Sequence, residues 1–177
     1  MLINPIFSQT KTEILCYDVD EFDDSKSLSG GTSIMYTDGG DLRTEGLLFS
    51  NIIDEKKNKI NKVNMVVYVY DKKIRCTDDG NTLDILFEDG SKTQLVNWKK
   101  FNCDGVNYFN MSESQTNDLK TKRIKGLRYT DKRNYNTITI KENLSEENKT
   151  FYINLYKEID NVNNGTSTIS ICKKEDK

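Results

Sequence analysis

Carboxylates are the residues of this sequence whose type and spacing come nearest to a catalytic arrangement. Two carboxyl groups that flank a glycosidic bond can hydrolyse it, one as the acid and the other as the base or nucleophile, and neither role requires histidine. Most of the carboxylates here stand in turn sequences, where Asp is favoured because its side chain bonds the nearby backbone. We therefore rank a carboxylate-dependent hydrolase third among three candidate functions, with candidate residues Asp78, Asp79, Asp84, Glu88 and Asp89.

The sequence contains no histidine, and this excludes the commonest catalytic devices. Ser-His-Asp and Cys-His nucleophiles, histidine-ligated metals and the usual general base all require an imidazole. The four cysteines are far apart and form no Cys-x-x-Cys pair, whereas a structural zinc site normally uses close ligand pairs. We expect no catalytic residue, no metal site and no cofactor.

The cysteines Cys16, Cys76, Cys103 and Cys172 allow three disulfide pairings, and the sequence does not choose among them. Buried free thiols are an equal alternative, since cysteine is among the most buried residue types. The acidic run from residue 18 to residue 24 predicts an exposed loop. It lacks the glycine at the sixth position and the glutamate at the twelfth position of a calcium-binding EF-hand loop.

An aromatic group surrounds the third cysteine and is the candidate ligand-binding site. It consists of Trp98, Phe101, Tyr108 and Phe109, with an Asp-Gly turn signal at residues 104–105. These rings could form a platform or pocket on which a ligand stacks. The alternative is a corner of the hydrophobic core beneath the preceding hairpin, because aromatic residues supply much of the buried area in a small β-rich protein.

Charge gives no support to nucleic-acid binding. Lys and Arg number 26 against 28 Asp and Glu, so the net charge is -2, whereas a nucleic-acid-binding domain is expected to carry a basic face. One local basic patch stands out, formed by Lys122, Arg123, Lys125 and Arg128 within a longer run of cations from Lys120 to Arg133. Its simpler interpretation is a solvated face, where lysines discourage edge-to-edge strand pairing.

Alternating apolar residues predict a chain built mainly of strands. Residues 64–70 are apolar or aromatic on both faces, which is typical of a central strand, and an Asp-Gly hairpin of type I′ is expected at residues 89–90. Ser29–Gly31 is expected to break the chain, and Asp54–Lys62 to be a charged connection. The expected strands cover residues 13–19, 32–36, 47–49, 64–70, 74–77, 82–87, 94–96, 124–129, 135–140 and 166–172.

Two segments carry helix signals. Ser112–Gln115 has the form of a capping box, in which the serine and glutamine side chains each bond the other's backbone amide, and it predicts a short helix ending near Lys122. Between residues 145 and 160 the apolar residues fit one helical face and also alternate in part, but the acidic start favours a helix. The fold class is therefore α+β: a mainly antiparallel sheet or partly closed barrel with one short helix and a longer C-terminal helix.

The length of 177 residues and a hydrophobic content of 35% are consistent with one domain. We expect a flexible N-terminus or signal remnant at residues 1–11, a single β-rich domain at 12–172 and a charged tail at 173–177. The longest apolar run, Met65–Tyr70, has the length of a strand, so no transmembrane segment is expected. The sequence does not indicate an oligomeric state.

Four segments resemble a loose group of uncharacterised small β-rich proteins of Bacteroidota type. They are Leu86–Ser91, Phe101–Cys103, Tyr108–Ser112 and Leu119–Tyr129, and the similarity extends roughly over residues 83–159. The group often stands behind a secretion signal and has no activity that could be transferred. The resemblance implies a compact fold and an extracytoplasmic address, and it implies no catalytic residue.

The leading functional hypothesis is a non-catalytic module that binds a protein or other polymer and is exported from the cell. It follows from the absence of a catalytic constellation or cofactor motif in the sequence. The alternative is a small-ligand binder with a pocket lined by the aromatic group around Trp98. No nucleic-acid partner is expected.

Overall fold

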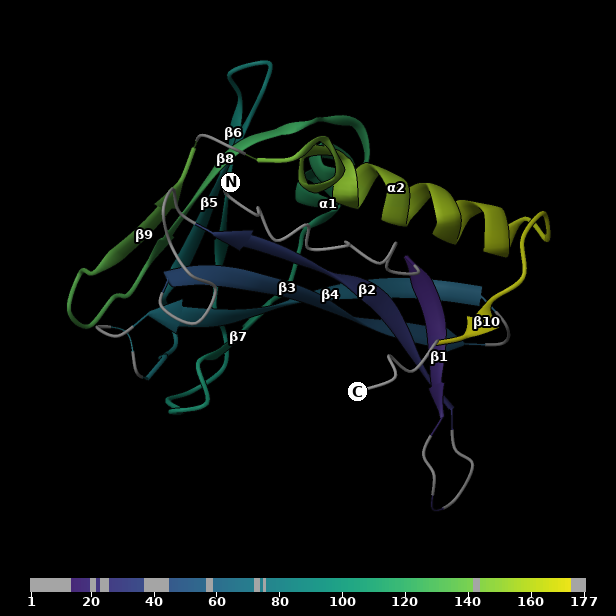
Figure 1. The fold of residues 1–177 in the computed structure, drawn as a ribbon, viewed down its shortest axis with the longest axis horizontal. Coiled ribbons are helices and arrows are strands. Elements are labelled where there is room, and N and C mark those ends of the chain that lie inside the picture. Colours follow the sequence, from purple (N-terminus) through teal and green to yellow (C-terminus); the bar gives the residue numbers. More distant parts are fainter. Residues whose placement is uncertain are drawn as a thin grey trace, which may run out of the picture.

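The computed structural model describes residues 14–19, 22, 26–36, 45–56, 59–71, 74, 76–141 and 144–172, which form two β-sheets and two α-helices (Figure 1). The six-stranded sheet has the order β10-β1-β2-β3-β4-β7, and the four-stranded sheet has the order β6-β5-β8-β9. The strands are β1 (Leu15–Val19), β2 (Lys26–Tyr36), β3 (Glu45–Lys56), β4 (Lys59–Asp71), β5 (Thr82–Phe87), β6 (Lys92–Val96), β7 (Val106–Phe109), β8 (Ile124–Thr130), β9 (Thr137–Ile140) and β10 (Ser170–Ile171). The helices are α1 (Glu113–Thr121) and α2 (Glu146–Asn163).

This architecture confirms the predicted α+β class. The described strand pairs are antiparallel except β1 with β10, and neither sheet closes into a barrel. The short and the longer C-terminal helix are both present, and the described residues form a single domain. Residues 1–11 and 173–177, for which a flexible or signal segment and a tail were predicted, lie outside the described residues.

The helices begin where the sequence predicts. The side chain of Ser112 accepts a hydrogen bond from the backbone of Gln115, whose side chain accepts one from the backbone of Ser112, so the capping box is complete. Ser145 caps α2 by accepting from the backbone of Asn148, which confirms the helix at residues 146–160. In the described part of the chain, no helix is long and apolar enough to cross a membrane.

Both helices lie on one side of the six-stranded sheet (Figure 1). The buried face of α2 packs on this side, and the apolar faces of β5, β8 and β9 continue the same core. The buried residues of α2 are Phe151, Tyr152, Leu155, Tyr156 and Ile159. This is the helical periodicity found in the sequence.

The prediction of a charged connection at Asp54–Lys62 was wrong, because β3 and β4 form one long hairpin through this segment. Their pairing continues to Glu55 with Ile60 and Lys56 with Lys59. Antiparallel pairing is made by backbone groups, so a charged sequence can take part in it. Asn163 at the end of α2 holds the hairpin by accepting from the backbone amide of Ile60 and donating to its carbonyl.

The predicted break at Ser29–Gly31 was also wrong, because β2 runs through both glycines. The pairing with β3 shifts register between Gly30 and Ser33, as in a β-bulge. A Cβ atom on Gly30 would lie 2.8 Å from Ile53 Cδ1 and 3.2 Å from Leu155 Cδ1. The glycine therefore lets α2 approach the strand rather than ending it.

The hairpin between β5 and β6 is where the sequence predicts it, but its turn type differs. The amide of Gly90 donates to Phe87 and the amide of Phe87 donates to Ser91, which leaves Glu88, Asp89 and Gly90 as a three-residue loop. Only the glycine has positive φ, at 86°. A type I turn followed by a left-handed glycine fits this pattern, and a type I′ turn does not.

Several predicted strands are shorter in the structure. Of the described residues 74, 76 and 77, only Thr77 pairs, through an isolated bridge to Asn102. The strand predicted from Tyr135 begins at Thr137, because Tyr135 has a φ of 56° and belongs to the preceding turn. The last strand is reduced to Ser170–Ile171.

The four cysteines form two disulfides, Cys16–Cys172 and Cys76–Cys103, which resolves the pairing that the sequence left open. The first joins residues 156 apart and fixes the short strand β10 beside β1. The second spans 27 residues and encloses the chain from the end of the β4 region to the loop before β7.

We expect the two disulfides to stabilise the fold unequally. A chain-entropy treatment, in which the crosslink restricts the unfolded chain, gives about 5 kcal/mol for the longer loop and about 3.5 kcal/mol for the shorter. Urea unfolding of the Cys16→Ser/Cys172→Ser and Cys76→Ser/Cys103→Ser variants measures both losses. A larger loss from the Cys76–Cys103 pair would contradict this ranking.

Stability should fall in alkaline solution because of the tyrosines buried around α2. Burial raises the pKa of Tyr156 to about 12 and raises the pKa of Tyr152 well above its usual value. In the unfolded chain tyrosine titrates near pH 10, so above that pH the folded state holds more protons than the unfolded state. The stability present below pH 10 is then lost as the pH rises toward the folded-state values.

The slope of the unfolding free energy against pH shows whether Tyr156 is responsible for this loss. Each such phenol contributes a loss of up to about 1.4 kcal/mol per pH unit, so the Tyr156→Phe variant should show a shallower decline than the parent. Urea unfolding between pH 8 and 11.5 measures the difference. Identical slopes for parent and variant would be the contrary result.

Candidate functional site

Three aromatic rings and two cations lie in the loop between β6 and β7, on β7 and in the turn between β8 and β9, and we call these five residues the aromatic platform. They are Trp98, Lys99, Phe101, Tyr108 and Arg133. The Trp98 and Tyr108 rings lie 5.7 Å apart, and Lys99 Nζ lies 4.4 Å from the centre of the Tyr108 ring. The Arg133 guanidinium lies 4.8 Å from the Phe101 ring. Trp98 is 56% exposed and Phe101 is 50% exposed.

Of the four aromatic residues predicted as a ligand site, only three reach this surface. Phe109 is completely buried and belongs to the hydrophobic core. Successive residues of a strand point to opposite faces, so Tyr108 and Phe109 on β7 are on different sides of the sheet. The core interpretation therefore holds for Phe109, whereas ligand binding by the other three rings stays a prediction. Trp98 and Phe101 lie on an open surface, not in the core corner.

Asn97 fixes the backbone beneath the platform. Its side-chain amide donates to the carbonyls of Asp78 at 2.7 Å and Lys99 at 3.1 Å. Its side-chain oxygen accepts from the amides of Lys99 and Tyr108, the latter at 2.8 Å. Asn97 is 1% exposed, so these bonds form in a buried setting where an unpaired backbone group would be costly.

The far end of the loop is held by the Cys76–Cys103 disulfide and its neighbours. Thr77 and Asn102 exchange both backbone hydrogen bonds, directly beside the disulfide. Gly105 then turns the chain into β7 with a φ of 70°, and its carbonyl accepts from the amide of Val69. A Cβ atom at this glycine would lie 3.0 Å from the Val69 carbonyl oxygen, so only glycine fits both the conformation and the space.

A buried polar cluster lies behind the platform, where the two sheets meet. The Asn81 side chain donates to the hydroxyl of Tyr129 at 2.7 Å, and that hydroxyl donates to Asn107 Oδ1 at 3.1 Å. Asn81 Oδ1 accepts from the amide of Lys132, and Asn107 donates to the carbonyl of Val67. Burial raises the pKa of Tyr129, so its phenol stays protonated and can donate.

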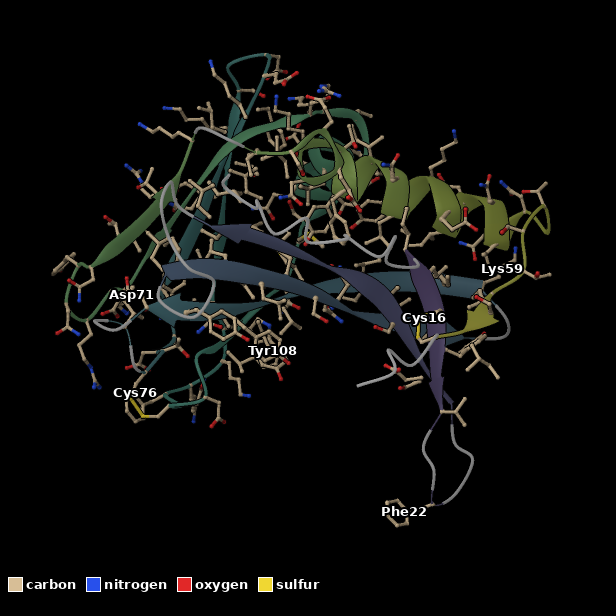
Figure 2. The ribbon with its side chains drawn as sticks, viewed as in Figure 1. Cys16, Phe22, Lys59, Asp71, Cys76 and Tyr108 are labelled. Atoms are coloured by element: carbon tan, nitrogen blue, oxygen red, sulfur yellow. A yellow bond between two sulfur atoms is a disulfide. The ribbon has the colours of Figure 1, made fainter. Side chains whose placement is uncertain are left out.

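The platform is continuous with the face of the six-stranded sheet that points away from α2 (Figure 2). In the register of β4 with β7, Val66 pairs with Tyr108 and Tyr68 pairs with Val106. Tyr68 is thus diagonal to Tyr108 on the same face, and Tyr70 follows two residues later and is 40% exposed. Aromatic side chains therefore extend from the platform along the outer face of β4.

The basic patch predicted from the sequence is largely neutralised by carboxylates. Arg123 bonds Glu88 at 2.8 Å and Glu146 at 2.6 Å, which raises the pKa of the guanidinium. Lys122 lies 2.7 Å from Asp118, whose hydrogen bond raises the pKa of the lysine.

The other two members of the patch are on β8. Arg128 pairs with Asp84 at 2.7 Å, and Lys125 is exposed. Since three of the four cations already bind carboxylates, the patch has little capacity for an anionic partner.

Most of the candidate catalytic carboxylates also form hydrogen bonds or ion pairs with neighbouring side chains. Hydrogen bonds from Ser91 lower the pKa of Asp89, whereas a general acid needs a raised pKa. Asp84 accepts from both Arg128 and Gln94, and Asp78 lies 3.5 Å from Arg133. Within the described residues, no cluster of three or more acidic, Cys or His side chains is arranged to hold a metal ion.

Sequence reasoning missed the residues that hold and complete the platform. Lys99 is adjacent to Trp98, but its position over Tyr108 depends on the fold. Arg133 was included only in the longer run of cations, and Asn97 was not selected at all. The only signal for Asn97 in the sequence was its position between the end of a strand and a tryptophan.

No protein-family model matches this sequence, and neither the curated proteins nor the solved structures show a significant similarity to it. The function is therefore inferred from the chemistry of the surface.

Removing the Asn97 side chain should loosen the platform without removing any of its rings. Asn97→Ala leaves buried backbone groups of Asp78, Lys99 and Tyr108 without their partner, and we expect a loss of about 3 kcal/mol in urea unfolding. Trp98 fluorescence anisotropy should also fall. Asn110→Ala is the control, because this exposed asparagine has one long bond, of 3.5 Å, to Lys62. Equal effects of the two substitutions would refute the role given to Asn97.

Proposed function

We propose that this protein is a non-catalytic binding module and that the aromatic platform is its contact surface. The observation that carries the proposal is a half-exposed Trp98 and Phe101 on a backbone fixed by buried bonds. Burying a large apolar side chain is worth about 1.5–3 kcal/mol, and these two rings forgo much of that gain in the free protein. Rigid, exposed aromatic residues lose little conformational entropy on binding and are enriched among residues that dominate binding energy.

A protein or polymer fits this surface better than a small molecule does. Small-molecule sites bury most of the ligand in a concave pocket. Here about half of each of the Trp98 and Phe101 side chains faces solvent, and further tyrosines continue along β4. A surface of this kind suits an extended partner that contacts several rings at once.

We also propose that the module works outside the cytoplasm. All four cysteines are paired, one pair joining distant parts of the chain and the other bracing the platform loop. Disulfides persist in oxidising compartments and are rare in the cytosol. The resemblance to Bacteroidota-type proteins that stand behind secretion signals implies the same address.

The single tryptophan gives a direct test, because all tryptophan emission comes from the platform. Titration with soluble polysaccharides, proline-rich peptides and solubilised envelope proteins should produce a saturable change in Trp98 emission with at least one class. Phe101→Ala should weaken that binding about tenfold, which corresponds to about 1.4 kcal/mol.

Phe22→Ala is the matched control, since Phe22 is an exposed aromatic residue at the tip beyond β1, far from Tyr108 (Figure 2). It should leave affinity unchanged. Failure of every class to change Trp98 emission would overturn the proposal. A partner whose affinity, measured by isothermal titration calorimetry, is insensitive to Phe101→Ala and to the tryptophan-free Trp98→Ala would overturn it as well.

A further inference from the structure

We infer that the partner of the aromatic platform is an acidic polysaccharide, that is, a polymer of sugar rings carrying carboxylates. This inference rests on the proposed binding function and names the chemistry of its ligand. Three properties of the surface must be matched together. They are the free ring surface, the cations without carboxylate partners, and the exposed carboxylates beside them.

The protein's own cations limit which ring faces are open to a ligand. Lys99 lies over the Tyr108 ring and Arg133 lies over the Phe101 ring, so each of these rings already has a positive charge on one face. A cationic ligand would be repelled from them. Trp98 has no such cation among the described contacts, and its indole offers a flat apolar surface with an N–H donor at the edge. The C–H face of a sugar ring can stack on such a surface while its hydroxyls remain solvated.

The cations around Trp98 differ from those of the sequence-predicted basic patch. No described carboxylate lies within ion-pair distance of Lys99, Lys100 or Lys132, whereas Lys122 and Arg123 are each bonded to two. The Lys132 side chain lies across Gly80, whose amide donates to the Asn97 carbonyl, so this charge stands close to the platform. These ammonium groups are free to bind the carboxylates of a ligand.

Two carboxylates next to the platform restrict the chemistry of the ligand further. Asp79 and Asp104 are exposed, and no described cation pairs with either. A ligand that carries only anionic acceptors along its backbone would be repelled by them. A polysaccharide supplies hydroxyl groups that can donate to both, as well as carboxylates for the lysines.

Single-stranded nucleic acid also combines anions with stacking rings, but it fits less well. It requires a positive groove along its backbone, and here the cations alternate with Asp78, Asp79 and Asp104 in a chain with a net charge of -2. A proline-rich peptide requires a groove between aromatic rings, and the Lys99 ammonium lies over the Tyr108 ring beside Trp98. Both remain as outcomes of the test.

The test compares polymers with the same sugar backbone and different charge. Polygalacturonate and its fully methyl-esterified form are titrated at low salt while Trp98 emission is followed, with alginate and hyaluronate as further acidic polymers. The acidic forms should bind at least about tenfold more tightly than the ester, and the difference should shrink at about 0.5 M salt because screening weakens exposed charge pairs.

Lysine variants test which cations bind the carboxylates of the polymer. Lys100→Ala/Lys132→Ala, which changes two exposed lysines outside the aromatic platform, should weaken binding of the acidic form about tenfold and leave binding of the methyl ester unchanged. Lys92→Ala, an exposed lysine at the start of β6, is the control and should have no effect.

The possible failures are distinguishable. Equal affinity for acid and ester, or a preference for oligo(dT) or a proline-rich peptide, would overturn the acidic polysaccharide while leaving a binding platform in place. Failure of every polymer, peptide and envelope protein to bind, or binding that survives Trp98→Ala in isothermal titration calorimetry, would contradict the proposed function itself. Circular dichroism of each variant ensures that a lost interaction is not a lost fold.

Discussion

The structure depends on the way the chain crosses from one sheet to the other through a buried region. Between β6 and β7 the backbone leaves the four-stranded sheet and joins the six-stranded sheet, and its polar groups there must be bonded although water is excluded. Three asparagines meet this requirement. Asn97 bonds the loop to Asp78 and Tyr108, while Asn81 and Asn107 join through the Tyr129 hydroxyl. Each is 1% exposed or less.

The exposed surface follows from this buried junction. Because Asn97 and the Cys76–Cys103 disulfide hold both ends of the loop, the intervening aromatic side chains project outward from a fixed backbone. The cations on the surface differ in whether they have carboxylate partners. Lys122 and Arg123, between α1 and β8, are neutralised by Asp118, Glu88 and Glu146, and the platform cation Arg133 pairs with Asp78. Lys99, Lys100 and Lys132, by contrast, have no ion pair with a described carboxylate.

Local patterns in the sequence predict much of the fold and little of the site. The capping box at Ser112 and the strand alternation of residues 82–87 involve neighbours along the chain, so they could be identified directly. Gly30 was mistaken for a break because its reason, close packing of Leu155, lies far away in sequence. Disulfide pairing, the neutralisation of the basic patch and the bonds of Asn97 likewise depend on residues brought together only by the fold. The aromatic residues were selected because they cluster along the sequence around Cys103, and that selection could not separate Phe109 from the exposed rings.

The most direct test of the account is the fluorescence of the single tryptophan in the free protein, recorded as time-resolved anisotropy with increasing acrylamide. We predict that Trp98 is quenched efficiently, because it is half exposed, and that its anisotropy decays mainly with tumbling of the whole molecule, because its backbone is fixed. An unquenched, blue-shifted emission would mean that the ring is buried in solution. A dominant subnanosecond decay would mean that it is not held. Either result would contradict a rigid, accessible aromatic platform.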